Sequence, residues 1–219
     1  MVDKGTGPPM IQRNGRFLGD SGYIVDIQGG ILRFRRAIQG TTGPKPTVFL
    51  DRDGVLNHHI VSGYVTRWAE FVILPGVLTA LQRLRNAGFR LVIVSNQAGV
   101  PKGFLTCDDL IRITSMSLKE FQNSGADVDG AFFCLHDPSD DCTCRKPKPG
   151  LLRAAADLFP TDFSHSFLVG DSLTDILAGA AVSCKTIYLA AKLDPSIPAT
   201  HQARNLEGAV DWITSASAD

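Results

Sequence analysis

The sequence predicts an α/β fold, a Rossmann-like three-layer sandwich with a central parallel sheet. From residue 45 onward, short apolar runs alternate with segments whose apolar residues recur at helical spacing, an order typical of parallel strands joined by helices. The chain has 219 residues, 44% hydrophobic and 20% charged, so we expect one domain with a sizeable core. Polar motifs directly follow three of the predicted strands. Parallel strands bring such motifs together at one edge of the sheet, where this kind of fold binds ligands.

The predicted elements follow one another from residue 47. A strand over residues 47–50 precedes a helix whose apolar side chains share one face and which ends at Asn86-Ala87-Gly88. Thr106 and Asp109 form a capping box for a helix that continues to Phe121. The further predicted elements are strands at 89–94, 131–135, 167–169 and 186–189, and helices at 150–159 and around 176–180.

Residues 1–45 precede this pattern and are expected to be an N-terminal extension, whereas residues 46–219 form the main domain. The extension is rich in glycine and contains two alternating stretches, 23–27 and 31–34, on either side of Gln28-Gly29-Gly30. Either these stretches pair as a β-hairpin, or the segment lies as an extended arm on the main domain. The sequence assigns no chemistry to it.

The charge balance and the short apolar segments argue against nucleic acid and membranes as partners. The chain has 22 basic and 22 acidic residues, so no net field attracts it to nucleic acid or to an anionic membrane. No apolar run approaches the ~20 residues that span a bilayer, and residues 1–10 lack the hydrophobic core of a signal peptide. We therefore expect a cytoplasmic monomer that binds a small molecule through local groups.

Asp51 and Asp53 are the first candidates for catalysis. They stand one residue apart, directly after an apolar run and just before Gly54, so both carboxylates leave the sheet edge at the same turn. A carboxylate can attack phosphorus while a neighbouring carboxylic acid protonates the leaving oxygen. Taken alone, the pair also fits a polar loop after a strand. The motifs that follow it in order favour the catalytic interpretation.

Two further polar motifs follow predicted strands. Ser95-Asn96-Gln97 comes after the strand at 89–94, and Gly170-Asp171-Ser172 comes after the strand at 167–169. Alone, the first also fits a helix cap and the second an ordinary tight turn. Together with the aspartate pair they place three polar loops at one edge of the sheet, which favours a shared site over three unrelated loops.

Cys134, His136, Cys142 and Cys144 form a metal-binding pattern. Four donors within eleven residues supply the ligands of a closed tetrahedral Zn²⁺ site. The alternative is a core cysteine, a loop histidine and two free thiols. Because four protein ligands leave no position for a substrate, we expect a structural zinc that fixes the polar loop between residues 137 and 143.

This ordered set of motifs resembles the haloacid dehalogenase superfamily of phosphohydrolases. Within it, the sequence is most similar to the branch of the D-glycero-D-manno-heptose 1,7-bisphosphate phosphatases and the related histidinol phosphatases. The resemblance extends over residues 46–214 and rests on the segments 51–54, 63–65, 75–77, 95–99, 134–136, 142–150 and 170–171, with Asp175. It implies a capless, Mg²⁺-dependent phosphomonoesterase that removes the C7 phosphate of the heptose bisphosphate through an aspartyl phosphate. Histidinol phosphate or another small ester is the alternative substrate, and a non-catalytic, zinc-stabilised binding protein is the alternative function.

The resemblance assigns roles to individual residues. It implies that Asp51 attacks phosphorus, that Asp53 protonates the leaving sugar oxygen, and that Mg²⁺ is bound by Asp51, the backbone carbonyl of Asp53 and Asp171. Such a hard cation offsets the repulsion between a carboxylate and a phosphate dianion. It also implies that the Ser95 hydroxyl and the Lys146 ammonium hold the transferred phosphoryl group.

The other candidates bind the substrate around the transferred phosphate. Asn96 and Gln97 continue the phosphate-binding motif that begins with the serine. Arg145 can grip the second phosphate of a bisphosphate with two parallel bonds. Gly63 and Tyr64 belong to a loop that contributes to specificity, because the segment between the first motif and the first long helix is too short for a cap domain.

Some positions near the expected site differ from the family pattern, and two histidines also lie near it. Ser172 stands where a lysine usually follows the metal-binding aspartate of the family, and Lys102-Gly103-Phe104 stands where Arg-Gly-Lys is common. These differences remove basic groups that would bind a distal phosphate. His58 and His59 have no ligand spacing and are expected in a solvated loop, with the mouth of the substrate site as the alternative.

Overall fold

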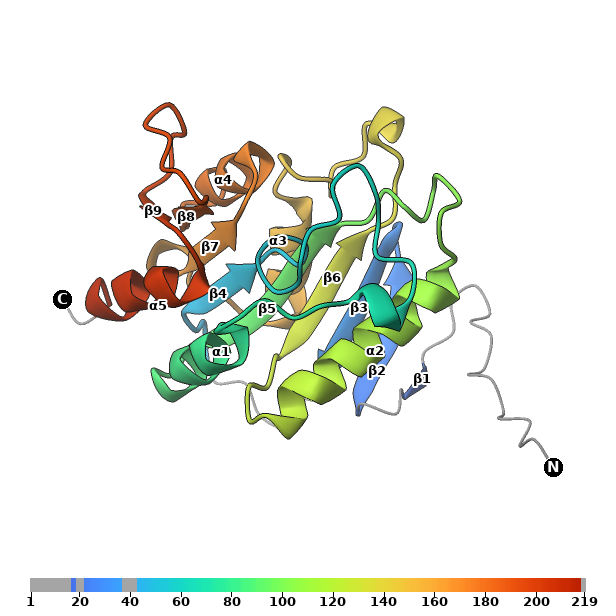
Figure 1. Cartoon of the computed structure of the whole chain (residues 1–219), viewed down its shortest axis with the longest axis horizontal. Coiled ribbons are helices and arrows are strands. Elements are labelled where there is room, and N and C mark those ends of the chain that lie inside the picture. The colour runs from blue at the N-terminus through green and yellow to red at the C-terminus, as the bar shows by residue number, and fades with distance from the viewer. Residues whose placement is uncertain (1–16, 19–21, 37–42, 218–219) are drawn as a thin grey trace.

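The computed structural model describes residues 17–18, 22–36 and 43–217 (Figure 1). The strands are β1 (Phe17–Leu18), β2 (Tyr23–Gln28), β3 (Ile31–Arg36), β4 (Thr47–Leu50), β5 (Arg90–Asn96), β6 (Gly130–Cys134), β7 (Phe167–Gly170), β8 (Lys185–Leu189) and β9 (His201–Ala203). The α-helices are α1 (Val77–Asn86), α2 (Cys107–Asn123), α3 (Gly150–Leu158), α4 (Leu173–Ala180) and α5 (Leu206–Ser215). Short 3₁₀ helices are η1 (Trp68–Glu70), η2 (Pro138–Asp140) and η3 (Phe163–His165).

Helices cover both faces of one sheet, which gives the predicted three layers. α1, α2 and α5 lie on one face, and α3 and α4 lie on the other (Figure 1). Leu81, Leu110 and Ile213 bury the first set of helices against the sheet, and Leu152 and Ala178 bury the second set. The predicted fold class is confirmed.

The parallel part of the sheet has a switch point at its centre. The described strands are ordered β1-β2-β3-β6-β5-β4-β7-β8-β9, and those from β6 to β9 in this order pair parallel. From β4 the chain first adds β5 and β6 on one side, and later β7, β8 and β9 on the other. All four residues of β4 are buried, as expected for a central strand covered on both faces. Ligands bind such sheets outside the carboxyl ends of the strands beside the switch point.

The described part of the N-terminal segment is a β-hairpin that extends this sheet. β2 and β3 pair antiparallel, and β3 pairs antiparallel with β6. Of the two alternatives, the structure therefore confirms the β-hairpin and not the extended arm. Tyr23 and Phe34 are completely buried in the same core cluster as the apolar face of α2. The other parts of the extension, residues 1–16, 19–21 and 37–42, lie outside the described residues.

Element boundaries differ modestly from the predicted ones. β5 continues to Asn96, so Ser95 lies within the strand. α4 begins at Leu173, because the Ser172 side chain accepts a hydrogen bond from the Thr174 N–H (3.2 Å) and starts the helix earlier than predicted. β9 and α5 were not predicted. None of the helices in the described ranges is long and apolar enough to cross a membrane.

Candidate active site

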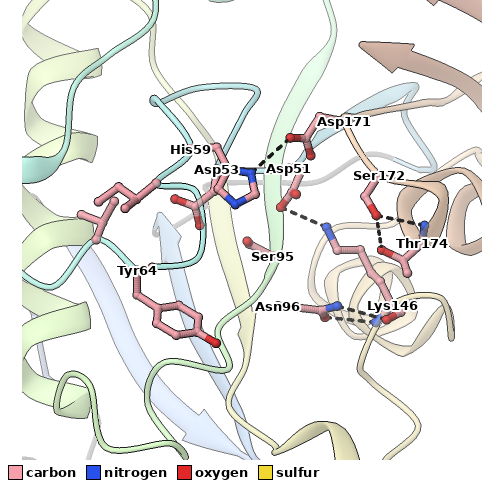
Figure 2. A pocket seen from close by; sticks show the side chains of 13 residues that line it. Asp51, Asp53, His59, Tyr64, Ser95, Asn96, Lys146, Asp171, Ser172 and Thr174 are labelled. Atoms are coloured by element: carbon pink, nitrogen blue, oxygen red, sulfur yellow. Dashed lines mark hydrogen bonds and ion pairs between the residues drawn. The ribbon is translucent and has the colours of Figure 1, made fainter. Parts of the chain in front are cut away.

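The carboxyl ends of β4, β5 and β7 meet at a cavity of about 200 Å³ beside the switch point (Figure 2). Three motifs distant in sequence come together here, because β5 and β7 flank β4. Eight of the ten residues predicted to act in catalysis, magnesium binding or substrate binding line the cavity. The lining residues are Asp51, Asp53, His59, Ile60, Gly63, Tyr64, Val65, Ser95, Asn96, Lys146, Asp171, Ser172 and Thr174.

Gly54 allows the chain to turn sharply after β4. Its φ is +83°, a left-handed conformation that glycine adopts readily. The Gly54 N–H donates to the Asn57 carbonyl (2.8 Å), and the Leu56 N–H donates to the Arg52 carbonyl (2.8 Å), which closes the turn. A Cβ at position 54 would lie 1.9 Å from Oδ2 of Asp171. Only glycine therefore leaves room for Asp171 beside this turn.

Lys146 is buried between two carboxylates. The residue is 3% exposed, and its Nζ lies 3.0 Å from Asp51 Oδ1, 2.5 Å from Asp175 Oδ1 and 2.8 Å from the Val94 carbonyl oxygen. Burial alone would lower the pKa of Lys146, but the two carboxylates outweigh it and raise the pKa above its ordinary value. The lysine is therefore a fixed positive charge beside Asp51 (Figure 2).

Asp51, Asp171 and Asp175 bring three carboxylates together. One oxygen from each lies within 4.8 Å of the others. Burial and the charge of Asp51 raise the pKa of Asp171 to about 6, and His59, whose Nδ1 lies 3.6 Å away, partly offsets this. Mutually repelling carboxylates fit a hard divalent cation with oxygen ligands. The cluster therefore fits Mg²⁺ bound by Asp51 and Asp171, while Asp175 pairs with the lysine.

Three side chains hold Asp53 by hydrogen bonds. Oδ2 accepts from Arg52 Nη2 (2.8 Å) and Gln97 Nε2 (3.1 Å), and Oδ1 accepts from Asn57 Nδ2 (2.9 Å). Burial would raise the pKa of Asp53, but the charge of Arg52 and these hydrogen bonds lower it below its ordinary value. Asp53 is therefore fixed in position and favoured as an anion.

The end of β5 supplies a hydroxyl to the cavity and a clamp for the lysine loop. The Ser95 hydroxyl oxygen accepts a hydrogen bond from Gln97 Nε2 (3.2 Å) and faces the cavity. Asn96 makes two bonds to the backbone of Lys146: Nδ2 donates to its carbonyl (3.0 Å), and Oδ1 accepts from its N–H (3.0 Å). Asn96 therefore fixes the loop that carries the lysine (Figure 2).

Two predicted substrate-binding residues, Gln97 and Arg145, do not line the cavity. Gln97 is 2% exposed, and its amide nitrogen donates to Asp53 and Ser95. The structure thus gives Gln97 a positioning role. Arg145 is half-buried beside Lys146. In the zinc loop, residues 137–143, hydrogen bonds from Ser139 lower the pKa of Asp137, and the charges of Lys102 and Arg145 add to this.

The sequence analysis assigned no role to Arg52 and Asn57, and it named Asp175 only as part of the motif set without assigning it a contact. Arg52 and Asn57 are buried polar residues. Arg52 stands between the two aspartates and Asn57 shortly after them, and this position was the signal available in the sequence. In the structure Asp175 belongs to the capping box of α4 with Ser172, and its carboxylate also pairs with Lys146. His59 lines the cavity, which is the alternative that the sequence had left open for it.

The four predicted zinc ligands gather beyond the end of β6. Cys144 Sγ lies 3.2 Å from Cys134 Sγ, 3.5 Å from Cys142 Sγ and 3.2 Å from His136 Nδ1. Tetrahedral zinc with Zn–S bonds of about 2.3 Å places its sulfur ligands about 3.8 Å apart, so the cluster is close to the required size. Hydrogen bonds from Cys144 and from the His136 backbone lower the pKa of Cys134, which favours the thiolate that binds metal. The set fits a structural Zn²⁺.

A rim made of Tyr64, Phe104 and Lys102 adjoins the cavity through Tyr64, which lines it. The two ring centres lie 5.1 Å apart, and Phe104 is 62% exposed. Lys102 Nζ lies 3.3 Å from the Tyr64 hydroxyl oxygen. The rim thus combines an apolar surface with one positive charge.

The fold and the cavity together indicate a hydrolase with a Rossmann-like fold, in which two aspartates and a buried lysine meet at the carboxyl ends of the parallel strands. A family model described as haloacid dehalogenase-like hydrolase matches residues 12–183. The chain belongs to this family.

Individual proteins that are similar to this chain point to one branch of the family. The chain is 34% identical over 168 residues to the D-glycero-beta-D-manno-heptose-1,7-bisphosphate 7-phosphatase of Helicobacter pylori, covering 76% of this chain and 95% of that protein. It is 38% identical over 151 residues to the phosphatase of the same name from Pasteurella multocida, covering 66% and 81%. Among solved structures, the D,D-heptose 1,7-bisphosphate phosphatase of B. bronchiseptica, complexed with magnesium and phosphate, superposes with a TM-score of 0.70 at 30% identity, covering 78% of this chain and 99% of that one.

Proposed function

We propose that residues 46–219 form a Mg²⁺-dependent phosphatase that removes the C7 phosphate of D-glycero-β-D-manno-heptose 1,7-bisphosphate through a phosphoaspartate at Asp51. One observation carries the proposal: Asp51 Oδ1 lies 3.0 Å from the Lys146 ammonium in a cavity that Asp53 and Asp171 also line. The relatives named above are phosphatases for this sugar bisphosphate, and the B. bronchiseptica structure holds magnesium and phosphate.

In the first half-reaction, Asp51 attacks the phosphorus of the C7 phosphate. The new P–O bond forms at Asp51 while the bond from phosphorus to the sugar oxygen breaks, and Asp53 gives its proton to that leaving oxygen. A phosphate dianion beside Asp53 opposes the effect of Arg52 and favours the protonated acid. Lys146 and the Ser95 hydroxyl stabilise the charge on the phosphoryl oxygens. Bound Mg²⁺ would offset the repulsion between carboxylate and phosphate.

In the second half-reaction, Asp53 is the anion that its three hydrogen-bond donors favour. It accepts a proton from water as the water oxygen attacks phosphorus, and the bond to Asp51 breaks to release inorganic phosphate. Asp53 regains in this step the proton that it lost in the first. Gln97 and Asn57 keep its carboxylate oriented through both steps.

The substrate proposal rests on the open side of the cavity. Between β4 and α1 the described chain forms only loops and η1, so the bulk of a sugar bisphosphate can extend out of the cavity. The rim supplies an apolar surface for the C–H face of the sugar, and Lys102, on the rim, and Arg145, beside the cavity, supply positive charge for the second phosphate.

The test is release of inorganic phosphate from the heptose 1,7-bisphosphate, from histidinol phosphate and from simple sugar monophosphates, with Mg²⁺ supplied. We expect kcat/KM to favour the bisphosphate by about a hundredfold, because a bound second phosphate stabilises the transition state by about 2.7 kcal/mol. Asp51→Asn should abolish turnover, whereas Asp211→Asn, at an exposed position on α5, should not change it. Equal rates on all esters would contradict the substrate proposal, and turnover by Asp51→Asn would contradict the nucleophile.

A further inference from the structure

We infer that the N-terminal hairpin is part of the zinc site: its turn at Gly29-Gly30 is a support that holds the ring of His136 in position for the metal. Residues 1–45 otherwise have no assigned role. The inference concerns binding of zinc and does not depend on which substrate the cavity accepts.

The first observation is the direct approach of His136 to Gly30. A Cβ at position 30 would lie 2.2 Å from Cε1 of the imidazole, 2.4 Å from Nε2 and 3.0 Å from Nδ1. The ring therefore lies in the space that any other residue would fill with its side chain. Since Nδ1 is the atom that points toward the cysteine cluster, displacing the ring would displace the ligand atom.

The second observation is backbone pairing next to the ligands. Ile31 is the antiparallel partner of Cys134, and the Leu135 N–H donates to the Gly30 carbonyl (3.0 Å). The hairpin thus binds the residue between the first two zinc ligands. Ile31 also packs against the core cluster that contains Cys134 and Cys144.

These contacts matter because the zinc loop contributes little packing of its own. η2 contains no buried residue, so the loop must be ordered largely by its metal and by neighbouring elements. A ligand whose ring is already fixed loses less conformational entropy when the metal binds. Groups that orient a metal-binding histidine typically change metal affinity about 10- to 100-fold when they are removed.

A simpler explanation is that the two glycines only satisfy the geometry of a two-residue hairpin turn. Gly29 and Gly30 have φ values of +56° and +71°, as a type I′ turn requires, so alanine strains the backbone at either position. The surroundings differ, because a Cβ at Gly29 would meet nothing within 4 Å. Gly29→Ala is therefore a matched control for Gly30→Ala.

The experiment compares these two variants in the full chain after purification with zinc. We measure zinc content, the rate of zinc release to a chelator, and the melting temperature with and without zinc. Gly30→Ala should release zinc about tenfold faster or more, and zinc should raise its melting temperature less than it raises that of Gly29→Ala. Equal release rates and equal zinc-dependent stabilisation in the two variants would overturn the inference.

A second pair of variants keeps the test available if Gly30→Ala does not fold. Ile31→Ala shortens the side chain that packs toward the cysteine ligands, and Ile24→Ala makes the same change on β2 of the hairpin. Faster zinc release from Ile31→Ala than from Ile24→Ala supports the inference. The same release rate from both contradicts it.

Discussion

The carboxylate cavity and the zinc cluster are assembled in opposite ways. The cavity collects Asp51, Ser95 and Asp171 from three strand ends, so it exists only once the parallel sheet has formed. The zinc ligands all lie between residues 134 and 144, in and just beyond β6. Topology positions the first site, whereas one short segment supplies all four predicted ligands of the second. The two sites are nevertheless joined through the chain, because Lys146 follows Cys144, the last predicted zinc ligand, by two residues.

Replacing Lys146 should produce the largest difference between an effect on catalysis in the cavity and an effect on zinc binding. Lys146→Met removes the buried ammonium beside Asp51 and should lower kcat about 10²- to 10³-fold, as loss of a preorganised charge does, while zinc content stays unchanged. Lys148→Met is the matched control, because Lys148 lies in the same loop and pairs with the exposed Asp141. Steady-state kinetics and metal analysis measure both effects. A kcat for Lys146→Met close to that of the control would contradict the role of the lysine.

Removing one zinc ligand should affect the cavity indirectly. Cys142→Ser should lower zinc content and raise KM together, because the loop that carries Arg145 and Lys146 loses its fixed shape. Cys107→Ser, on α2 and outside the cluster, is the control. If Cys142→Ser lacks zinc but keeps unchanged kinetics, the two sites are not coupled through this loop.

A smaller effect confined to the cavity is expected from Gln97. Its hydrogen bond helps to lower the pKa of Asp53, so Gln97→Met should raise that pKa. kcat/KM reports the first half-reaction, in which Asp53 acts as the acid. The alkaline limb of the kcat/KM profile should then move to higher pH, since Asp53 would remain protonated to a higher pH than in the parent protein. Zinc content should not change. Gln122→Met, on α2, serves as the control, and superimposable pH profiles would contradict the positioning role.

Local chemistry in the sequence predicted much of both sites. The aspartate pair, Ser95 and Asp171 follow apolar runs, and their convergence followed from the parallel order of the strands. The spacing of Cys134, His136, Cys142 and Cys144 predicted a zinc site, and the structure brings these four side chains together. The three-layer fold followed from alternating strand and helix patterns.

The features that the sequence did not reveal depend on long-range packing. Asp175 stood in the motif set, but its ion pair with Lys146 depends on the placement of α4 beside β7, which the sequence alone does not show. Whether residues 23–34 formed a hairpin or an arm was settled by pairing of β3 with β6, which lies about a hundred residues further along the chain. Gln97 stands in a phosphate-binding motif, yet the fold turns its amide toward Asp53.

The proposed mechanism requires that Asp51 becomes phosphorylated during turnover. Quenching the working enzyme and reducing it with borohydride converts an aspartyl phosphate to homoserine, which peptide mass spectrometry can locate. We predict homoserine at position 51 when substrate and Mg²⁺ are both present, and none in Asp51→Asn. Active enzyme that yields no homoserine at position 51, or yields it at Asp53 or Asp171 instead, would contradict the account.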